Sequence, residues 1–258
     1  MTDLLARWFE TYGRHDLPWR HTRDPWAVLV SEVMLQQTQV ARVLAAWPGF
    51  IGRFPEPTVM AKAGVGAVIS SWGRLGYPRR ARRLWESAVL IGDTGWPEDL
   101  TELPGVGRYT AGAIRAQADD ADVPAVEVNV RRVVQRVRGT RLSERAAEDA
   151  MVRIGRGLSG RDRLLALMDL GATVCTPRAP ACLSCPLRRR CATHGPIPDE
   201  VIARQPAFEG SFRQRRGIVM ARLRAELRVA IAELDAEALA SLVSDGLAVV
   251  IDSEASLP

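Results

Sequence analysis

Apolar residues recur at the spacing of α-helices along most of the chain. Residues 2–13 place large apolar side chains on one stripe behind Thr2, the expected N-cap. A second helix is predicted from Pro25 to about Leu44, because Asp24 can cap it and proline is tolerated at the first helical position. Further helices are predicted over residues 57–70, 79–92, 128–137, 143–158 and 161–170. No strand-like alternation interrupts them, so residues 1–195 are predicted to form an all-α domain.

The pattern changes near the C-terminus. Residues 196–212 are irregular and contain prolines, which predicts a linker. Residues 213–227 and 235–244 are then predicted to be helices, and residues 246–252 a short strand. Two helices followed by a strand predict a small winged-helix-like module over residues 213–258.

Two carboxylates stand out against this helical background. Glu32 lies in a helix that is apolar nearly all round, and it shares one helical face with Gln36 and Gln39. That face can be a functional site or an ordinary exposed stripe, and the pattern leaves both open. Glu127 stands two residues before Asn129, at the start of a basic segment with helical periodicity. We interpret residues 126–132 as the stretch where the chemistry takes place.

Residues 103–107 read Leu-Pro-Gly-Val-Gly and lead directly into small helix-forming residues. Such a turn exposes backbone N–H groups at a helix N-terminus, where a phosphate can bind without a side-chain charge. A tight turn between two helices has the same pattern. Gly105 and Gly107 therefore mark either a phosphate site or a simple connection.

The formal net charge is +5, and the cationic side chains are almost all arginine, with Lys62 the single lysine. Positive charge suits a polyanionic partner, although an arginine-biased genome gives the same composition. Arginines 79, 80, 82 and 83 form either a solvated helical face or a phosphate-contacting edge. No signal peptide and no membrane-spanning run is recognised, so a cytoplasmic protein without a membrane partner is expected.

All four cysteines lie within a single short stretch, which argues for a metal site and against a disulfide framework. They are separated by six, two and five residues. Four thiolates at this spacing can hold a tetrahedral zinc or a cubane iron-sulfur cluster. The ligands are Cys175, Cys182, Cys185 and Cys191.

With these motifs in order, residues 15–192 resemble the helix-hairpin-helix DNA glycosylases, and among them the MutY-type adenine glycosylases. The resemblance rests on Leu-Pro-Trp-Arg, Ser-Glu-Val-Met-Leu-Gln-Gln-Thr-Gln, Leu-Gly-Tyr, Leu-Pro-Gly-Val-Gly, Asn-Val-Arg-Arg-Val and Met-Asp-Leu-Gly-Ala. It implies an all-α, two-lobed fold with DNA in the cleft. It also implies a 4Fe–4S cluster in the loop 175–191, with zinc as the alternative.

The resemblance further implies removal of adenine mispaired with 8-oxoguanine or guanine, after the nucleotide has been flipped out of the duplex. By analogy, Glu32 protonates the base and positions water, and Glu127 faces the sugar cation with Asn129 orienting it. The Gln36-Gln37 pair resembles the residues that fill the gap left by the flipped nucleotide, and Tyr77 resembles a second intercalating side chain. Arg20 and Tyr109 resemble residues of the base pocket, and the further implied DNA contacts are Gly105, Gly107 and Arg108. The implied partner is double-stranded DNA with a mismatch or lesion, bound by a monomer.

Three departures from the family pattern leave alternatives open. The family places aspartate where this chain has Glu127, so the chain is a working adenine glycosylase, an enzyme for another base, or a DNA-binding paralogue that has lost activity. Bifunctional relatives carry a lysine after the hairpin, where this chain has Arg108-Tyr109. Arginine cannot form a Schiff base, so a monofunctional glycosylase is predicted. The tail resembles the short form of actinobacterial members and lacks a large reader domain.

Overall fold

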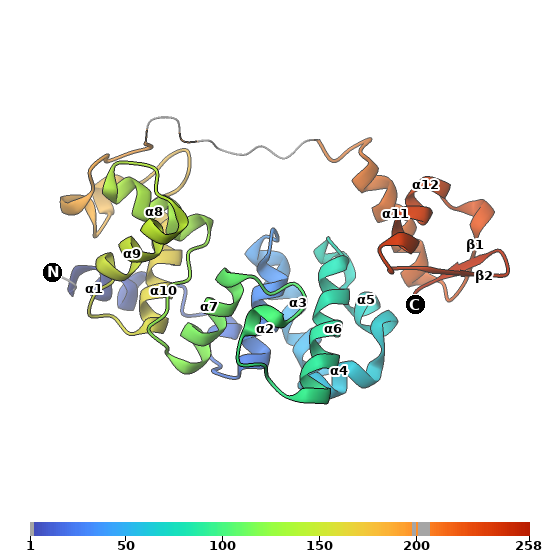
Figure 1. The fold of residues 1–258 in the computed structure, drawn as a ribbon. Helices are drawn as coiled ribbons and strands as arrows, with labels where there is room; N and C mark the ends of the chain where they lie inside the picture. The colour runs from blue at the N-terminus through green and yellow to red at the C-terminus, as the bar shows by residue number, and fades with distance from the viewer. Residues whose placement is uncertain (1–2, 198–199, 201–206) are drawn as a thin grey trace. The chain divides into compact units, whose positions relative to one another are not determined.

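The computed structural model describes residues 3–197, 200 and 207–258. The chain divides into two compact units (Figure 1). The first unit comprises Met1–Glu32 and Val106–Ala203, and the second comprises Val33–Gly105 and Arg204–Pro258. Each unit is therefore built from two segments that are far apart in the sequence.

The described residues of the first unit form helices and loops. Its helices are α1 (Asp3–Tyr12), most of α2 (Pro25–Leu35), α7 (Arg108–Asp119), α8 (Val128–Arg138), α9 (Glu144–Ile154) and α10 (Gly160–Asp169). They enclose a core in which Val130, Met151 and Leu164 are completely buried. The valine stripe of residues 128–137 therefore faces inward, as the periodicity predicts.

The second unit begins with four helices that pack around large aromatic residues. These helices are α3 (Val40–Arg53), α4 (Pro57–Ala63), α5 (Val65–Trp72) and α6 (Arg79–Thr94). Trp72 is 1% exposed, and its ring meets that of Phe50 edge-on at a centroid distance of 5.6 Å. Aromatic rings of this size supply much of the apolar area that a small helical core buries.

The single helix predicted from Pro25 to about Leu44 is wrong. α2 ends at Leu35, and α3 begins at Val40 after a turn in which Gln37 has a φ of 52°. A left-handed residue cannot continue a right-handed helix, so Glu32 and the glutamines do not share a helical face. The helix predicted over 57–70 is likewise two helices, divided at Gly64, where φ is 82°.

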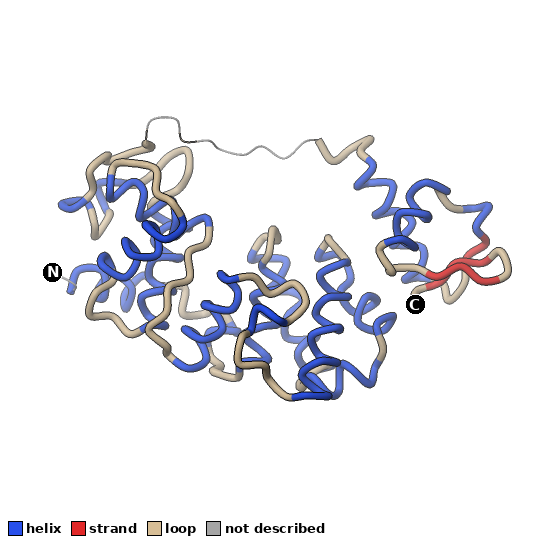
Figure 2. Tube along the Cα trace, in the orientation of Figure 1, coloured by secondary structure: helices blue, strands red, loops and turns tan. Residues whose placement is uncertain are grey.

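The C-terminal part of the second unit contains α11 (Phe212–Ala225), α12 (Ala236–Ser244) and a small antiparallel sheet (Figure 2). Its strands are β1 (Val229–Ala230), β2 (Val249–Ile251) and β3 (Glu254–Ser256), in the order β1-β3-β2. The sequence predicts only β2. The other two strands have two and three residues, too few for an alternating pattern to be recognised.

This C-terminal part is bonded to the helices of its own unit. Arg82 on α6 donates to the Asp245 carbonyl at 2.5 Å, and Arg224 on α11 donates to the Ile69 carbonyl at 3.2 Å. The division into residues 1–195, 196–212 and 213–258 stays a prediction. Residues 198–199 and 201–206 of the predicted linker lie outside the described residues.

Short helical turns complete the fold. They are η1 (Pro18–Arg20), η2 (Gly73–Leu75), η3 (Leu100–Glu102), η5 (Cys182–Ser184), η6 (Arg188–Arg190), η7 (Ile231–Glu233) and the π-helical turn η4 (Leu170–Val174). η4 passes very close to α8: a Cβ added to Gly171 would lie 2.7 Å from Cβ of Asn129. Glycine at this position allows the backbone to pass directly beside Asn129.

Candidate active site

Glu32 is 5% exposed, so the interpretation of its face as a solvated stripe is wrong. Two side chains from α7 hold its carboxylate. Tyr109 donates its hydroxyl to Oε2 at 2.9 Å, and Gln117 donates its amide to Oε1 at 2.8 Å. A buried carboxyl group with an oriented donor on each oxygen, on an otherwise apolar helix, is a strong candidate for acid–base chemistry.

Burial raises the pKa of Glu32 above its ordinary value, because the ionised form loses its hydration. The hydrogen bonds from Gln117 and Tyr109 act in the opposite direction and are outweighed. The negative charge of Glu127 adds to the increase. Glu32 is therefore suited to carrying a proton at a pH where an exposed glutamate would have lost it.

This shift has a consequence for stability. A carboxyl group whose pKa is raised by folding favours the native state below pH 4.5, its ordinary value, and this contribution is lost as the pH rises through the raised pKa. Glu32→Gln removes the cost of the buried charge. We expect its Tm at pH 7 to exceed that of the wild type by about 2–4 °C, the shift that about 1 kcal/mol causes in a chain of this size.

Thermal unfolding of both proteins at pH 4 and pH 7 tests this expectation. The difference in Tm should shrink at pH 4, where the wild-type carboxyl is also neutral. Glu10→Gln, which removes an exposed carboxylate from α1, is the matched control and should change Tm little at either pH. A Glu32→Gln protein that is less stable than the wild type by the same amount at both pH values would contradict the argument.

Glu127 is the N-cap of α8, and both of its oxygens are used. Oε1 accepts the Val130 N–H at 2.9 Å, and Oε2 accepts the Asn129 N–H at 2.8 Å and its side-chain amide at 3.0 Å. Aspartate, asparagine and serine are the usual caps, because a short side chain reaches these groups easily. The longer glutamate side chain of this protein reaches the same groups.

Burial raises the pKa of Glu127, while the N–H groups of Asn129 and Val130 and the charge of Arg132 oppose that increase. Glu32 is the more deeply buried of the two carboxyls and has only neutral donors. Glu127 has three N–H donors, two of them backbone groups at the positive end of a helix dipole. The environments thus favour a protonated Glu32 and an ionised Glu127.

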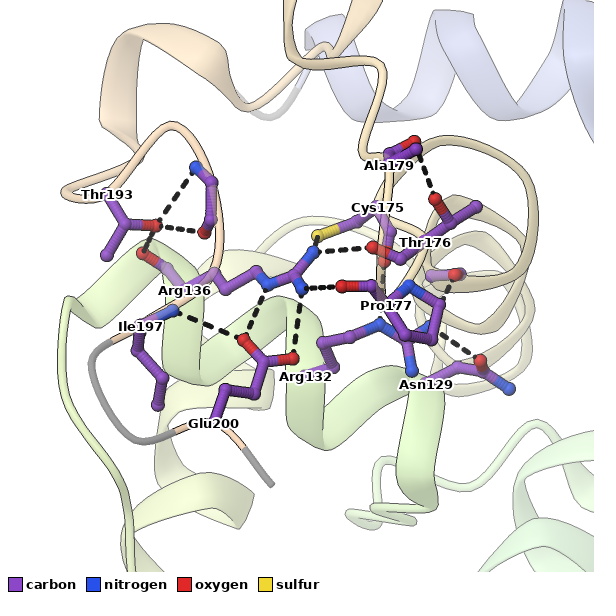
Figure 3. A network of polar contacts seen from close by, with 12 residues as sticks. Asn129, Arg132, Arg136, Cys175, Thr176, Pro177, Ala179, Thr193, Ile197 and Glu200 are labelled. Carbon is purple, nitrogen blue, oxygen red and sulfur yellow. Dashed lines mark hydrogen bonds and ion pairs between the residues drawn. The ribbon is translucent and has the colours of Figure 1, made fainter. Parts of the chain in front are cut away.

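Arg132 connects Asn129, the partner of Glu127, with the cysteine loop (Figure 3). Its guanidinium donates to Asn129 Oδ1 at 2.7 Å and to the Cys175 carbonyl at 2.7 Å. It also donates to the carbonyl of Gly171 in the turn η4. Arg132 is only 8% exposed, so it cannot serve as a surface contact to phosphate. It orients Asn129, which in turn holds Glu127.

Arg136, one turn further along α8, holds the start of the cysteine loop itself. It donates to Cys175 Sγ at 3.5 Å and to the carbonyls of Thr176 and Pro177 at 2.8 Å each. Its other edge forms an ion pair with Glu200 at 2.9 Å (Figure 3). Two buried arginines on one helix therefore fix the loop that carries the thiols.

All four cysteines line one pocket, together with apolar side chains from α8, η4 and the loop. The apolar residues are Val133, Val137, Leu170, Val174 and Leu187. A largely apolar cavity with four thiols around its wall fits an inorganic cluster that is shielded from water. Among the residues that the structure describes, no three His, Cys, Asp or Glu side chains are grouped closely enough to hold a single ion.

Arg20 lies in the first unit with its guanidinium committed to Asp169. The two groups form a bidentate pair at 2.6 and 2.7 Å, and Arg14 also donates to Asp169. Burial alone would raise the pKa of Asp169. Hydrogen bonds and positive charge from Arg20 and Arg14 outweigh burial and hold this pKa below its usual value. The positive charge of Arg20 still lowers the pKa of Glu32, which places it within electrostatic reach of the candidate acid.

Several residues of this site are not among those singled out from the sequence. Asp169 is completely buried, and Gln117 is almost completely buried. Arg161 donates to the backbone carbonyls of both Gln117 and Arg20. Asp169 belongs to the Met-Asp-Leu-Gly-Ala motif, which is a usable signal. Gln117 stands in an ordinary amphipathic helix, where no pattern distinguishes it.

The remaining predicted DNA contacts lie at turns. Gln36, Gln37 and Tyr77 belong to the second unit and are discussed below. Gly105 has a φ of 82°, which L side chains adopt rarely, and Gly107 is the N-cap residue of α7 with no side-chain cap. The first N–H groups of α7 therefore have no side-chain cap, and a phosphate site at this helix start stays a prediction. Arg108 is exposed and pairs with Glu148 at 3.0 Å.

Comparison with known proteins identifies the family of the chain. Residues 30–155 match the model of the HhH-GPD superfamily base excision DNA repair protein. The adenine DNA glycosylase of Mycobacterium tuberculosis is 42% identical over all of this chain and 93% of its own length. The chain belongs to the HhH-GPD superfamily. The adenine DNA glycosylase of Mycolicibacterium smegmatis is 41% identical over 94% of this chain and 90% of its own length.

A solved member with similar structure is a thermostable thymine-DNA glycosylase. Its TM-score is 0.67 at 28% identity, and the match covers 75% of this chain and 94% of the other. Membership in the superfamily makes the protein a DNA N-glycosylase of base excision repair with the helix-hairpin-helix fold. No helix in the described part of the chain is long and apolar enough to cross a membrane.

Proposed function

We infer that this protein removes adenine from DNA, and we propose that the adenine is mispaired with 8-oxoguanine or guanine. The observation that carries the proposal is the buried Glu32, which Tyr109 and Gln117 hold by hydrogen bonds. It lies in the same unit as Glu127, the N-cap of α8. The similarity to adenine DNA glycosylases supports adenine over thymine, because the identity is 42% over all of this chain for one of them and 33% over 72% of the chain for a thymine-DNA glycosylase.

The proposed chemistry divides the work between the two carboxyls. Glu32, protonated because it is buried, donates its proton to a ring nitrogen of the flipped adenine, so that the base leaves as a neutral molecule. The sugar then carries positive charge, which the ionised Glu127 stabilises. Glu32, now ionised, accepts a proton from the attacking water, and Asn129 keeps the Glu127 carboxylate in place.

The test is a single-turnover assay with a panel of duplexes that contain adenine, thymine or uracil opposite 8-oxoguanine or guanine. We expect release of adenine, fastest opposite one of the two guanine bases, and little release of the pyrimidines. Retained binding to the duplex without release of any base would show a DNA-binding protein. Release of a pyrimidine in preference to adenine would show another substrate class.

We propose that the cysteine loop holds a 4Fe–4S cluster through Cys175, Cys182, Cys185 and Cys191. The support is the single apolar pocket that all four thiols line. When bound, the cluster supplies a rigid centre around which the loop and its arginines fold. Arg136 holds Cys175 from the protein side through its N–H contact to sulfur.

The purified protein is therefore expected to be brown, with a broad visible absorption band and about four irons and four sulfides per chain. Cys185→Ser should lose the band. Ser184→Ala, at the neighbouring exposed position, is the matched control and should keep it. A colourless protein with one zinc per chain would replace this proposal by a tetrahedral zinc site.

We further propose a monofunctional enzyme that acts as a monomer. The single lysine, Lys62, lies exposed on α4 in the second unit, and the position after the hairpin is Arg108. Borohydride should therefore trap no covalent complex between protein and DNA during base release. A trapped complex that disappears in Lys62→Arg would contradict this. A cytoplasmic, nucleoid-associated location goes with the DNA substrate and is part of the same proposal.

A further inference from the structure

Two turns of the second unit carry the residues proposed to enter the duplex. One contains Gln36 and Gln37 and separates α2 from α3, and the other contains Tyr77 and precedes α6. Each has a residue in the left-handed region that is not glycine: Gln37 has a φ of 52° and Tyr77 a φ of 48°. Such backbone is strained, so it persists only where its surroundings enforce it.

The group that enforces both turns is the side chain of Arg80 in the first turn of α6. Its Nη1 donates to carbonyls that end α2 and enter the first turn, at Val33 (2.8 Å), Met34 (3.1 Å) and Gln36 (2.5 Å). Its Nη2 donates to carbonyls that lead into the second turn, at Leu75 (3.3 Å) and Gly76 (3.0 Å). One guanidinium therefore binds both turns.

Two neighbours complete this arrangement. Thr38 accepts a hydrogen bond from Arg80 at 2.9 Å, and its own hydroxyl lies 3.3 Å from the carbonyls of Gln36 and Leu75. The Arg80 guanidinium lies over the rings of Trp72 and Tyr77, with its carbon 5.3 and 5.4 Å from the ring centroids. Cation–π contact with Tyr77 fixes the very ring that is proposed to enter the duplex.

Arg80 is 8% exposed, so it is neither part of a solvated helical face nor a phosphate-contacting edge, the two alternatives left open by the sequence. Burial lowers its pKa to about 10, and it stays charged at neutral pH. The planar fork of guanidinium presents donors in two directions at once. A lysine ammonium presents three donors from a single point and cannot span the same acceptors.

We propose that Arg80 is a positioning residue for base flipping: it joins the Gln36–Gln37 turn and the Tyr77 turn into one preorganised wedge that fills the duplex when the target nucleotide leaves. The inference rests on the proposed function only in requiring that the protein flips a base. Because the wedge acts before any bond breaks, its loss should impair release of a paired base, which must first be pulled out of its pair, far more than release of an unpaired base.

The experiment compares Arg80→Gln, Arg80→Lys and Thr38→Val with the wild type. Thr38→Val keeps the guanidinium and removes only the hydroxyl that both turns share. Arg224→Gln is the matched control, since Arg224 is an arginine of the same unit that is bonded to a single carbonyl away from the turns. Circular dichroism and the visible absorption band of each protein establish that it is folded.

Flipping is measured by the fluorescence of 2-aminopurine placed beside the target adenine, in a Glu32→Gln background that keeps the base attached. Release is measured in the Glu32 protein, on adenine opposite 8-oxoguanine and on adenine opposite an abasic-site analogue. For Arg80→Gln and Arg80→Lys we expect a loss of the fluorescence rise. Their release rate should fall about 10- to 100-fold on the paired adenine and less than about 3-fold on the unpaired one. Thr38→Val should show a fluorescence rise and a release rate on the paired adenine that lie between those of the Arg80 variants and those of the wild type.

Equal losses on both duplexes, or an unchanged fluorescence rise in Arg80→Gln, would overturn the proposal. If Arg80→Gln does not fold, Arg80→Lys and Thr38→Val test the proposal instead, with the same two duplexes and the same fluorescence measurement. If the wild type releases no adenine from either duplex, the proposed function fails. The fluorescence comparison still decides the role of Arg80 in that case, because it requires no bond to be broken.

Discussion

Glu32→Gln is expected to lower the single-turnover rate of adenine release by about 1,000-fold, within the range that general acid catalysis contributes. Glutamine is nearly isosteric and can accept the hydrogen bond from Tyr109 or Gln117, but it has no proton to give to the leaving base. The rate is measured with enzyme in excess over a duplex containing 8-oxoguanine opposite adenine. Affinity for that duplex should stay within about threefold of the wild type, because the exchange leaves the DNA contacts in place.

The pH dependence of the wild-type rate provides a second test of the same role. The reactive form has Glu32 protonated and Glu127 ionised. Release should therefore decline as the pH rises through the raised pKa of Glu32 and decline again at low pH as Glu127 takes up a proton. The apparent pKa values of this pH profile belong to the pair of carboxyls and not to either one alone, since the two carboxyls influence each other. A rate in Glu32→Gln within about threefold of the wild type would exclude Glu32 as the proton donor.

Glu127→Gln is expected to lower the rate of adenine release by at least about 100-fold, whereas Glu127→Asp should stay within about tenfold of the wild type. Loss of the charge removes the stabilisation of the sugar cation. Shortening the side chain keeps that charge, and aspartate is a natural cap for the same N–H groups of Asn129 and Val130. The carboxylate position is therefore set by the helix N-terminus more than by the length of the side chain.

The same assay on both variants checks this, with iron content as a measure of an intact fold. Equal rates in Glu127→Gln and the wild type would show that the carboxylate is not used. A large gain in Glu127→Asp would show that the extra methylene is a real handicap. The third outcome, a large loss in both variants, would mean that this active site has adapted to glutamate.

Much of this fold could be predicted from the sequence, because long helices bury apolar stripes that a period of 3.6 residues reveals. α1, α6, α8 and α12 lie within two residues of their predicted bounds. The break at Gln37 was not predictable, since glutamine carries no signal for a left-handed conformation and the apolar pattern continues on either side. Burial of Glu32 could not be decided either, because the deciding partners lie on α7, distant in sequence.

Arginine was the residue type on which sequence reasoning failed most clearly. Arg80 belongs to a stretch that the sequence leaves open between a solvated helical face and a phosphate-contacting edge, and Arg132 to a basic segment with helical periodicity. Each is instead buried and donates to backbone carbonyls of segments far away in the chain. A guanidinium can satisfy several such carbonyls at once, which makes it a structural element as readily as a surface charge. Sequence alone gives the charge and not the direction in which the side chain points.

The buried arginines also change what the composition implies about DNA binding at different ionic strengths. Each protein cation that neutralises a phosphate releases counterions, and the logarithm of the affinity then falls with the logarithm of the salt concentration by about 0.9 per phosphate contacted. Arginines at positions 80, 132, 136, 161 and 163 are buried and contribute nothing to that slope. The affinity of this protein for DNA should therefore depend on salt less steeply than its arginine content suggests, and more of it should come from contacts that salt does not screen.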